Sequence, residues 1–415
     1  MRFKNKLIIS FFVGVSCLTS CAQNSVSTNV SKTAVAESIE IEDIIVKILP
    51  VQTGAEITTE YLPLLQNKKV GLVANHTSYI NQTHLVDTFI QLGVNIQRVF
   101  APEHGFRGDH DAGANIKHGT DEKTGLPIFS LHGSTKKPSV ESLAGIEVMV
   151  FDIQDVGARF YTYISTLHYV MEACAENNIP LIVLDRPNPN GHYVDGPVLK
   201  MENQSFIGKH PVPVVYGMTI GEYAQMINGE KWLKNEVTCD LTVVELANWN
   251  HQTTYNLPIP PSPNLPNQLS IYLYPSLCFL EGTEMNEGRG TEIPFQVYGH
   301  PNYADTSFSY TPKAIKGKSM YPKFKEELCY GKDLSDLNPD SIQKWNTINW
   351  TYLLDAYQNT KTQKFFNRPD FFVLLEGQNK IIPAIQNNSL DSLITSWKPE
   401  IDAFKTIRKK YLIYE

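Results

Sequence analysis

Short apolar runs separated by polar segments recur through the first two thirds of the sequence. Six runs have the length of a β-strand and are bounded by polar or turn-forming residues. They occupy residues 70–74 (VGLVA), 99–101 with Ile96 before them, 128–131, 148–153 (VMVFDI), 181–184 (LIVL) and 241–246 (LTVVEL). Helical spacing of apolar residues fills the intervals, at 84–92, 140–144, 163–177 and 219–233. Because the runs are almost continuously apolar, we expect helices on both faces of the sheet. The pattern predicts an α/β fold with a Rossmann-like parallel sheet.

The pattern changes in the last third of the chain. Residues 257–266 (LPIPPSPNLP) contain five prolines, which exclude regular helix and central strand and predict a rigid surface connector. Farther along, 371–375 is predicted as a buried strand, and apolar residues at helical steps near the C-terminus predict a helix that kinks or breaks at Pro399. We therefore expect a catalytic domain over residues 43–300 and a smaller α+β auxiliary domain over 301–415 that completes the cleft.

The N-terminus has the pattern of an export signal. A basic hexapeptide precedes residues 7–15 (LIISFFVGV), an apolar run too short to span a bilayer. Residues 18–21 (LTSC), at the end of the predicted lipoprotein signal peptide 1–21, resemble a bacterial lipobox, which implies cleavage before Cys21 and acylation of that cysteine. Residues 22–42 are rich in Ser, Thr and Asn and predict a flexible tether. The expectation is an exported lipoprotein facing the periplasm, bound to the membrane through its lipid only; an ordinary secretory signal is the alternative.

Composition and missing motifs exclude several classes of protein. With 42% hydrophobic and 19% charged residues in 415, the bulk of the chain can bury a core. The net charge of −7 becomes −10 without the three basic residues of the leader, so nucleic acid is a poor partner. Neither GxGxxG nor a P-loop occurs, and no GxSxG is present, so we expect no nucleotide cofactor and no serine triad. The remaining cysteines, Cys174, Cys239, Cys278 and Cys329, are widely spaced, and buried free thiols are expected.

Polar residues follow the carboxyl ends of successive predicted strands, where open parallel sheets bind ligands. If the strands are parallel, one crevice collects Asn75, His76, Glu103, His104, Asp152, Asp155, Asp185 and Arg186. Glu103 is the strongest catalytic candidate among them, because a proline precedes it and two nearby glycines let its loop turn closely against a ligand. Partial desolvation there would suit a general acid. The alternative is a solvated glutamate, or one paired with Arg107.

The loop after Glu103 is rich in histidine. His104, His110, His118 and His132 lie within 29 residues, but their spacing matches neither HExxH nor HxxEH. We expect no metal site, and a metal-dependent hydrolase that uses this loop stays an alternative.

Aromatic residues cluster beside charged ones in two places. Phe160, Tyr161 and Tyr163 follow Arg159. A second group, Tyr272, Tyr274, Phe295 and Tyr298, flanks the segment 281–290 (EGTEMNEGRG), with Glu292 just beyond it. Rings and carboxylates together suit a carbohydrate, and an acidic sugar would add an arginine, Arg159 or Arg289, for its own carboxylate.

Six motifs together resemble one family: VANHTS (73–78), PEHGFRG (102–108), FDIQDVGARFYTYISTL (151–167), LDRPNPNG (184–191), EGRGTEIPFQVYGHP (287–301) and R-x-x-YLIY (408–414). It is the NamZ-type exo-β-N-acetylmuramidases, glycoside hydrolase family 171, formerly a domain of unknown function. The resemblance implies a Rossmann-like domain with a smaller auxiliary domain, and release of N-acetylmuramic acid from non-reducing ends of peptidoglycan fragments. The family's catalytic glutamate in the PEHG motif falls on Glu103. Asp152, Asp155 and Glu292 are the candidates for the second catalytic group.

The expected activity is therefore an exo-acting glycosidase of cell-wall turnover, without a cofactor. Glu103 would protonate the leaving oxygen, while a second carboxylate activates water, acts as nucleophile or steadies the sugar's 2-acetamido group. Substrate contacts are expected from Asn75, His76, His104, Arg159, Tyr161, Asp185, Arg186, Arg289 and Tyr298. The alternatives are the metal-dependent hydrolase and a non-catalytic sugar-binding lipoprotein.

Overall fold

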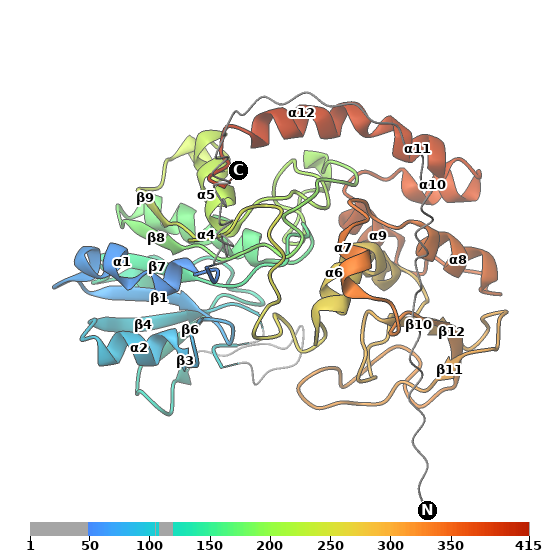
Figure 1. Ribbon diagram of the computed structural model, residues 1–415, viewed down its shortest axis with the longest axis horizontal. Helices are drawn as coiled ribbons and strands as arrows, with labels where there is room; N and C mark the ends of the chain where they lie inside the picture. The colour runs from blue at the N-terminus through green and yellow to red at the C-terminus, as the bar shows by residue number, and fades with distance from the viewer. Residues whose placement is uncertain (1–48, 104, 108–118, 415) are drawn as a thin grey trace, which may run out of the picture. The chain divides into compact units, whose positions relative to one another are not determined.

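The central element of the computed structural model is a seven-stranded sheet; the model describes residues 49–103, 105–107 and 119–414 (Figure 1). Its strands, in spatial order, are β5 (Gly119–Thr120), β6 (Pro127–Ser130), β4 (Ile96–Ala101), β1 (Val70–Ala74), β7 (Val148–Asp152), β8 (Leu181–Leu184) and β9 (Leu241–Val244). All neighbours pair in parallel except β5, which is an antiparallel edge. The six parallel strands have the order 3-2-1-4-5-6 of the doubly wound Rossmann fold, which confirms the predicted sheet.

Helices cover both faces of this sheet, as predicted. On one face, α1 (Thr58–Leu65) and α2 (Leu85–Gln91) share a hydrophobic core with inward side chains such as Leu72 and Val150. On the other face, α4 (Tyr163–Glu176) and α5 (Ile220–Gly229) pack with side chains such as Phe151. The remaining short elements of this region are β2 (Tyr79–Ile80), β3 (Thr83–His84), α3 (Val140–Leu143), and the 3₁₀ helices η1 (Gly54–Glu56), η2 (Met201–Asn203) and η3 (Lys234–Glu236).

The C-terminal part contains a small antiparallel sheet and a series of helices. The sheet has the order β10 (Val297–His300), β12 (Cys329–Asp333), β11 (Ser309–Tyr310). The helices are α6 (Gln268–Leu277), the 3₁₀ helix η4 (Cys278–Gly282), α7 (Pro339–Gln343), α8 (Thr351–Asn359), α9 (Pro369–Glu376), α10 (Ile381–Gln386), α11 (Leu390–Ser396) and α12 (Lys398–Arg408). Phe372 of α9 and Phe404 of α12 belong to the same hydrophobic core as the α4 face of the large sheet. The two parts therefore pack through one continuous core.

One predicted strand is wrong: residues 371–375 lie in helix α9. Pro369 stands in the first turn, where its missing N–H costs nothing, and Gly377 ends the helix with a left-handed φ of 84°. A short apolar run fits a buried helix as well as a buried strand. Here the proline in the first turn and the glycine after the last turn are typical of a helix. The predicted break near Pro399 is confirmed, because α11 ends at Ser396 and Pro399 lies in the first turn of α12.

The end of the chain returns to the large sheet beside α5 (Figure 1). The Tyr414 hydroxyl donates a 2.7 Å hydrogen bond to Asp185 Oδ2, directly after β8, and accepts one of 2.9 Å from the Leu246 N–H. Upstream, Arg408 Nε donates to the Gly217 carbonyl at 2.8 Å. These contacts give the YLIY motif a structural role at the sheet.

Cys174, Cys239, Cys278 and Cys329 are buried as free thiols, as expected. Among the helices of the described residues, none combines the length and the apolar character needed to cross a membrane. The leader, Cys21 and the tether over 22–42 lie outside the described residues.

Candidate active site

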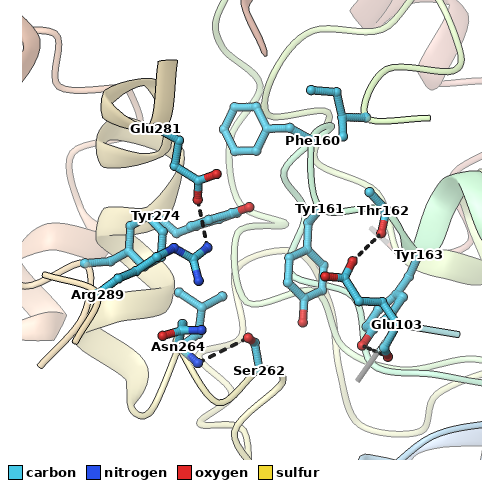
Figure 2. Close-up of a pocket in the computed structure, with 13 residues that line it drawn as sticks. Glu103, Phe160, Tyr161, Thr162, Tyr163, Ser262, Asn264, Tyr274, Glu281 and Arg289 are labelled. Carbon is cyan, nitrogen blue, oxygen red and sulfur yellow. Dashed lines mark hydrogen bonds and ion pairs between the residues drawn. The ribbon is translucent and has the colours of Figure 1, made fainter. Parts of the chain in front are cut away.

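A pocket of about 160 Å³ lies beyond the carboxyl edge of the large sheet (Figure 2). One wall comes from Glu103, after β4, and from residues 160–163, between β7 and α4. The facing wall comes from the proline-rich connector and from the segment after α6. The full lining is Glu103, Phe160, Tyr161, Thr162, Tyr163, Ile207, Ser262, Asn264, Leu265, Tyr274, Glu281, Arg289 and Phe295. The crevice expected from parallel strand ends is thus completed by segments far along the chain.

Glu103 presents its carboxylate to this pocket. Its Oε2 accepts a 3.5 Å hydrogen bond from Thr162 Oγ1, and its carbonyl accepts one of 3.5 Å from the Tyr163 hydroxyl (Figure 2). The Tyr163 hydroxyl in turn accepts a 2.9 Å hydrogen bond from Asn75 Nδ2, at the end of β1. The start of α4 therefore positions Glu103 after β4, and Asn75, after β1, acts from behind Tyr163.

Five aromatic rings form a continuous edge-to-face series around the pocket. Ring centroids are 4.9 Å apart for Tyr161 and Tyr163, 5.9 Å for Tyr161 and Tyr274, 5.3 Å for Phe160 and Tyr274, and 5.0 Å for Tyr274 and Phe295. Such pairs stabilise each other beyond simple burial. Burial raises the pKa of Tyr161, Tyr163 and Tyr274 well above the ordinary value, so their hydroxyls stay protonated. The lining combines apolar ring surface with fixed neutral hydroxyls.

Arg289 provides the cation of the facing wall. Its Nη2 contacts Glu281 Oε1 at 2.8 Å, its Nε contacts Glu287 Oε1 at 3.0 Å, and its guanidinium lies 5.3 Å from the centre of the Phe295 ring. Its side chain is 24% exposed, so it is sheltered and still accessible from the pocket. Figure 2 shows Arg289 and Glu281 across the pocket from Glu103.

The EGRG motif adopts a backbone that holds Arg289 in this position. Gly288 and Gly290, on either side of it, have φ values of 82° and 85°. A Cβ at Gly290 would also come within 2.6 Å of the Pro322 side chain. Glycine is therefore required here by both conformation and space.

Asp152 and Arg186 meet at the strand ends but pair with each other. Arg186 donates to both carboxylate oxygens of Asp152, at 2.5 and 2.9 Å, and to the Tyr79 carbonyl at 3.1 Å; both charged side chains are buried. The neighbouring Asp185 is occupied by hydrogen bonds from Thr219 Oγ1 and the Tyr414 hydroxyl, both at 2.7 Å. None of the three strand-end residues lines the pocket.

Asp155 is buried behind the pocket wall. Its Oδ2 accepts hydrogen bonds from the Tyr216 hydroxyl and, at 2.7 Å, from the Gly157 N–H. Its Oδ1 has no hydrogen-bond partner among the described residues. Burial raises the pKa of Asp155 to about 7. This carboxyl group is separated from the pocket, because Asp155 is not part of the lining.

Three further predicted residues lie away from the pocket. Arg159 is 0% exposed and donates hydrogen bonds to the carbonyls of residues 197, 212, 375 and 376 at 2.7, 2.7, 3.0 and 2.7 Å. The side chain of Glu292 is 77% exposed and pairs with Lys318 at 2.6 Å. The Tyr298 hydroxyl donates a 2.6 Å hydrogen bond to Asp355. We leave all three out of the proposed substrate contacts, because their groups are used within the fold or face outward.

The predicted histidines have different outcomes. His76 is held by a 3.0 Å hydrogen bond between Nε2 and the Pro260 carbonyl, and burial lowers its pKa, which favours the neutral ring. His104, His110 and His118 lie outside the described residues. No group of three or more potential metal ligands occurs within the described ranges.

The pocket wall formed by the proline-rich connector was not predicted from the sequence. Ser262, Asn264 and Leu265 are buried, and Asn264 Nδ2 donates to the Lys318 carbonyl at 3.0 Å. Thr162 was missed as well, although it lies between two aromatic residues that were singled out. The prolines correctly excluded regular helix and strand from the connector but carried no signal for the side that it presents to the pocket.

Comparison with known proteins assigns the chain to a family. Models described as "Exo-beta-N-acetylmuramidase NamZ, N-terminal" and "Exo-beta-N-acetylmuramidase NamZ, C-terminal" match residues 70–269 and 272–414. The chain belongs to the NamZ family. Within it, the chain is 36% identical over 404 residues to the peptidoglycan β-N-acetylmuramidase NamZ of Bacillus subtilis (strain 168), covering 92% of this chain and 96% of that protein.

Two solved structures share the fold of this chain. A DUF1343 family protein of Bacteroides fragilis NCTC 9343 matches with a TM-score of 0.82 and 46% identity, covering 88% of this chain and 99% of that one. A second DUF1343 family protein of the same strain matches with a TM-score of 0.74 and 31% identity over the same shares. The pocket draws on both NamZ regions, because Glu103 lies in the first matched segment and Arg289 in the second.

Proposed function

We propose that this chain is an exo-acting glycoside hydrolase that releases N-acetylmuramic acid from the non-reducing end of peptidoglycan fragments. The observation that carries the proposal is Glu103 facing Arg289 and Glu281 across one aromatic pocket in a NamZ family member. The pocket volume of about 160 Å³ is below the roughly 300–1,000 Å³ typical of sites for drug-sized ligands, which suits a single terminal sugar. The family match favours a glycosidase over the metal-dependent hydrolase and the non-catalytic binding protein.

Glu103 is the proposed general acid. Glycoside hydrolysis needs a carboxylic acid that protonates the leaving oxygen while an oxocarbenium-like transition state forms. The hydrogen bonds from Thr162 and Tyr163 fix the side chain and backbone of Glu103 at the pocket, which is the orientation that proton transfer requires.

Glu281 is our candidate for the second carboxylate. It lines the pocket, whereas Asp152, Asp155 and Glu292 do not. Its ion pair with Arg289 at 2.8 Å fixes the carboxylate on the wall facing Glu103. From there its negative charge stabilises the positive charge that develops on the sugar ring. A water molecule between the ring and this carboxylate would be activated as the nucleophile.

Arg289 is the proposed recognition group for the lactyl carboxylate that distinguishes muramic acid. Its Nε contacts Glu287 and its Nη2 contacts Glu281, and these two contacts use only part of the five N–H donors of a guanidinium. A guanidinium with donors still available binds a carboxylate more specifically than an ammonium group. The substrate preference would follow from this contact.

We also propose that the protein acts outside the inner membrane as a lipoprotein acylated on Cys21. The lipobox-like sequence and the extracytoplasmic position of peptidoglycan support this localisation. Growth with radiolabelled palmitate should label the wild-type chain, and Cys21→Ser should lose the label. A labelled Cys21→Ser chain would refute the acylation site.

Proton NMR of the first sugar released tests the reaction itself. Wild-type protein with an aryl N-acetylmuraminide should release N-acetylmuramic acid and report its anomeric configuration. On a peptidoglycan fragment, whose sugar leaving group needs the proton, Glu103→Gln should lose at least about 100-fold in turnover. Glu292→Gln is the matched control, because this exposed glutamate lies outside the pocket and should leave turnover unchanged. Absence of the sugar with the wild-type protein, or near-normal turnover of the fragment by Glu103→Gln, would overturn the proposal.

A further inference from the structure

A cluster of two aromatic rings and two lysines adjoins the pocket. We define the lysine–aromatic cluster as Lys136, Tyr169, Phe206 and Lys209, all of them half-buried. The rings of Tyr169 and Phe206 are stacked with centroids 6.2 Å apart and planes inclined by 17°. Lys136 Nζ lies 4.6 Å from the centre of the Phe206 ring, and Lys209 Nζ lies 4.5 Å from that of Tyr169. Cations and rings therefore form one interlocked surface patch.

The two lysines carry charge that the described fold does not neutralise. Within the described ranges, neither Lys136 nor Lys209 lies within ion-pair distance of a carboxylate; Lys209 Nζ donates only to the Tyr169 hydroxyl, at 3.1 Å. The neighbouring Lys137 differs, because it pairs with Glu172 at 2.7 Å and Glu176 at 2.6 Å. Two cations in fixed positions, in a chain of net charge −7, form a local site for an anion.

The cluster lies near the pocket along two stretches of the chain. Ile207, the residue after Phe206, lines the pocket, and so does Thr162 at the start of α4. Thr162, Thr166 and Tyr169 are spaced four and three residues apart, so they share one face of the helix. Seven residues of helix correspond to about 10 Å along the axis, and helical side chains tilt back toward the N-terminus, here toward the pocket.

We propose that the lysine–aromatic cluster binds the leaving-group portion of the peptidoglycan fragment, through its sugar faces and its carboxylates. This inference rests on the proposed exo activity, in which the pocket holds only the terminal sugar and the rest of the fragment extends past the pocket mouth. That remainder carries a lactyl carboxylate or an acidic stem peptide on every second sugar. The half-buried rings offer apolar surface to a sugar, and Lys136 and Lys209 offer cations for the carboxylates.

The test compares a short substrate with a long one. An aryl N-acetylmuraminide fills the pocket alone, whereas a fragment of several disaccharides reaches the cluster. The double variant Lys136→Gln/Lys209→Gln should lower kcat/KM for the long fragment roughly threefold to thirtyfold, mainly through KM, and leave the aryl substrate unchanged. The loss should shrink in high salt. Phe206→Ala should show the same selectivity without the salt dependence.

Matched controls separate this effect from a change of net charge or of folding. Lys361→Gln/Lys364→Gln removes the same charge from exposed positions outside the cluster and should affect neither substrate. Thermal melting checks that each variant is folded. Esterifying the carboxylates of the long fragment should weaken its binding to the wild type more than its binding to the Lys136→Gln/Lys209→Gln variant, because both proteins lose the Arg289 contact but only the wild type also loses the lysine contacts. An unchanged kcat/KM for the long fragment, or an equal loss on both substrates, would overturn the inference.

Failure of the proposed function gives a different result. If the wild type hydrolyses neither substrate, the exo activity is refuted, and calorimetry of the long fragment decides about the cluster. Weaker binding by the double lysine variant would then support a carbohydrate site, and equal binding would refute it.

Discussion

Replacing Arg159 by methionine should destabilise the protein without changing how substrate binds. The guanidinium is 0% exposed and joins the carbonyls of residues 197 and 212 to those of residues 375 and 376, at the end of α9. Arg159→Met keeps the length and apolar contacts of the side chain but removes all four hydrogen bonds. Four buried carbonyls would then each lose a charged partner.

The expected decrease in the free energy of unfolding is set by two opposing contributions. Hydrogen bonds to charged groups contribute about 1.5–3 kcal/mol each, so four of them reach well above 5 kcal/mol. Burial of the cation opposes this gain, and it lowers the pKa of Arg159 to about 10. Removing one partner from a buried charged arrangement typically costs about 3–5 kcal/mol. We expect a decrease of this size in the free energy of unfolding, out of roughly 5–15 kcal/mol for a folded protein.

Denaturation and kinetics together check this assignment. Unfolding in guanidinium chloride, followed by tryptophan fluorescence, should show a lower midpoint for Arg159→Met. Below that midpoint, the KM for an aryl N-acetylmuraminide should equal that of the wild type. Arg289→Met should behave in the opposite way, with a raised KM and a smaller change in stability. A stable Arg159→Met variant with a raised KM would show that Arg159 binds substrate, and our reading of its position would be wrong.

Three further predictions follow from the same contacts. Glu103→Gln should lose about 10²–10⁴-fold on peptidoglycan fragments but much less on aryl muraminides with acidic phenols, which leave without a proton; equal losses in steady-state assays would exclude a general-acid role. Tyr414→Phe removes the hydrogen bonds to Asp185 and Leu246 and should cost about 1–3 kcal/mol, seen as a lower thermal midpoint; an unchanged midpoint would contradict the anchoring role. Burial raises the pKa of Asp155 from its ordinary 3.8 to about 7, so between these pH values the folded state keeps a proton that the unfolded state has lost. The free energy of unfolding therefore falls as pH rises from about 4 to 7. Asp155→Asn should flatten that decline by up to about 4 kcal/mol in denaturation at several pH values, and an unchanged slope would refute the shift.

The parallel sheet could be predicted because its signal is local. β1 and β8 are continuous apolar runs bounded by polar residues, and both coincide with the predicted ranges 70–74 and 181–184. The strand order was not predicted, because handedness and short connections allow more than one doubly wound order. Helix α9 shows the limit of this signal, since five apolar residues in a row fit either element and the flanking Pro369 and Gly377 had to be weighed as end signals.

The site could be predicted only in part, because its contacts join distant segments. Glu103 and Arg289 were recognised from their motifs and do line the pocket. Asp152 is the last residue of β7, but Arg186, 34 residues away, neutralises it, and no spacing rule shows that pairing. Glu281 belongs to a segment that was singled out for its glycines and acids, yet only the fold shows that it faces Glu103.

The anchoring of Tyr414 bears on how the protein matures. The Tyr414 hydroxyl is hydrogen-bonded to Asp185, which lies 229 residues earlier in the sequence. A chain still emerging from the ribosome therefore contains β8 long before it contains Tyr414. Contacts of such long range form late and slow the approach to the native state. This carboxyl group therefore stays without its Tyr414 hydrogen bond until the last residues are in place, and chains truncated within the last few residues should be more sensitive to proteases although every strand of the sheet is present.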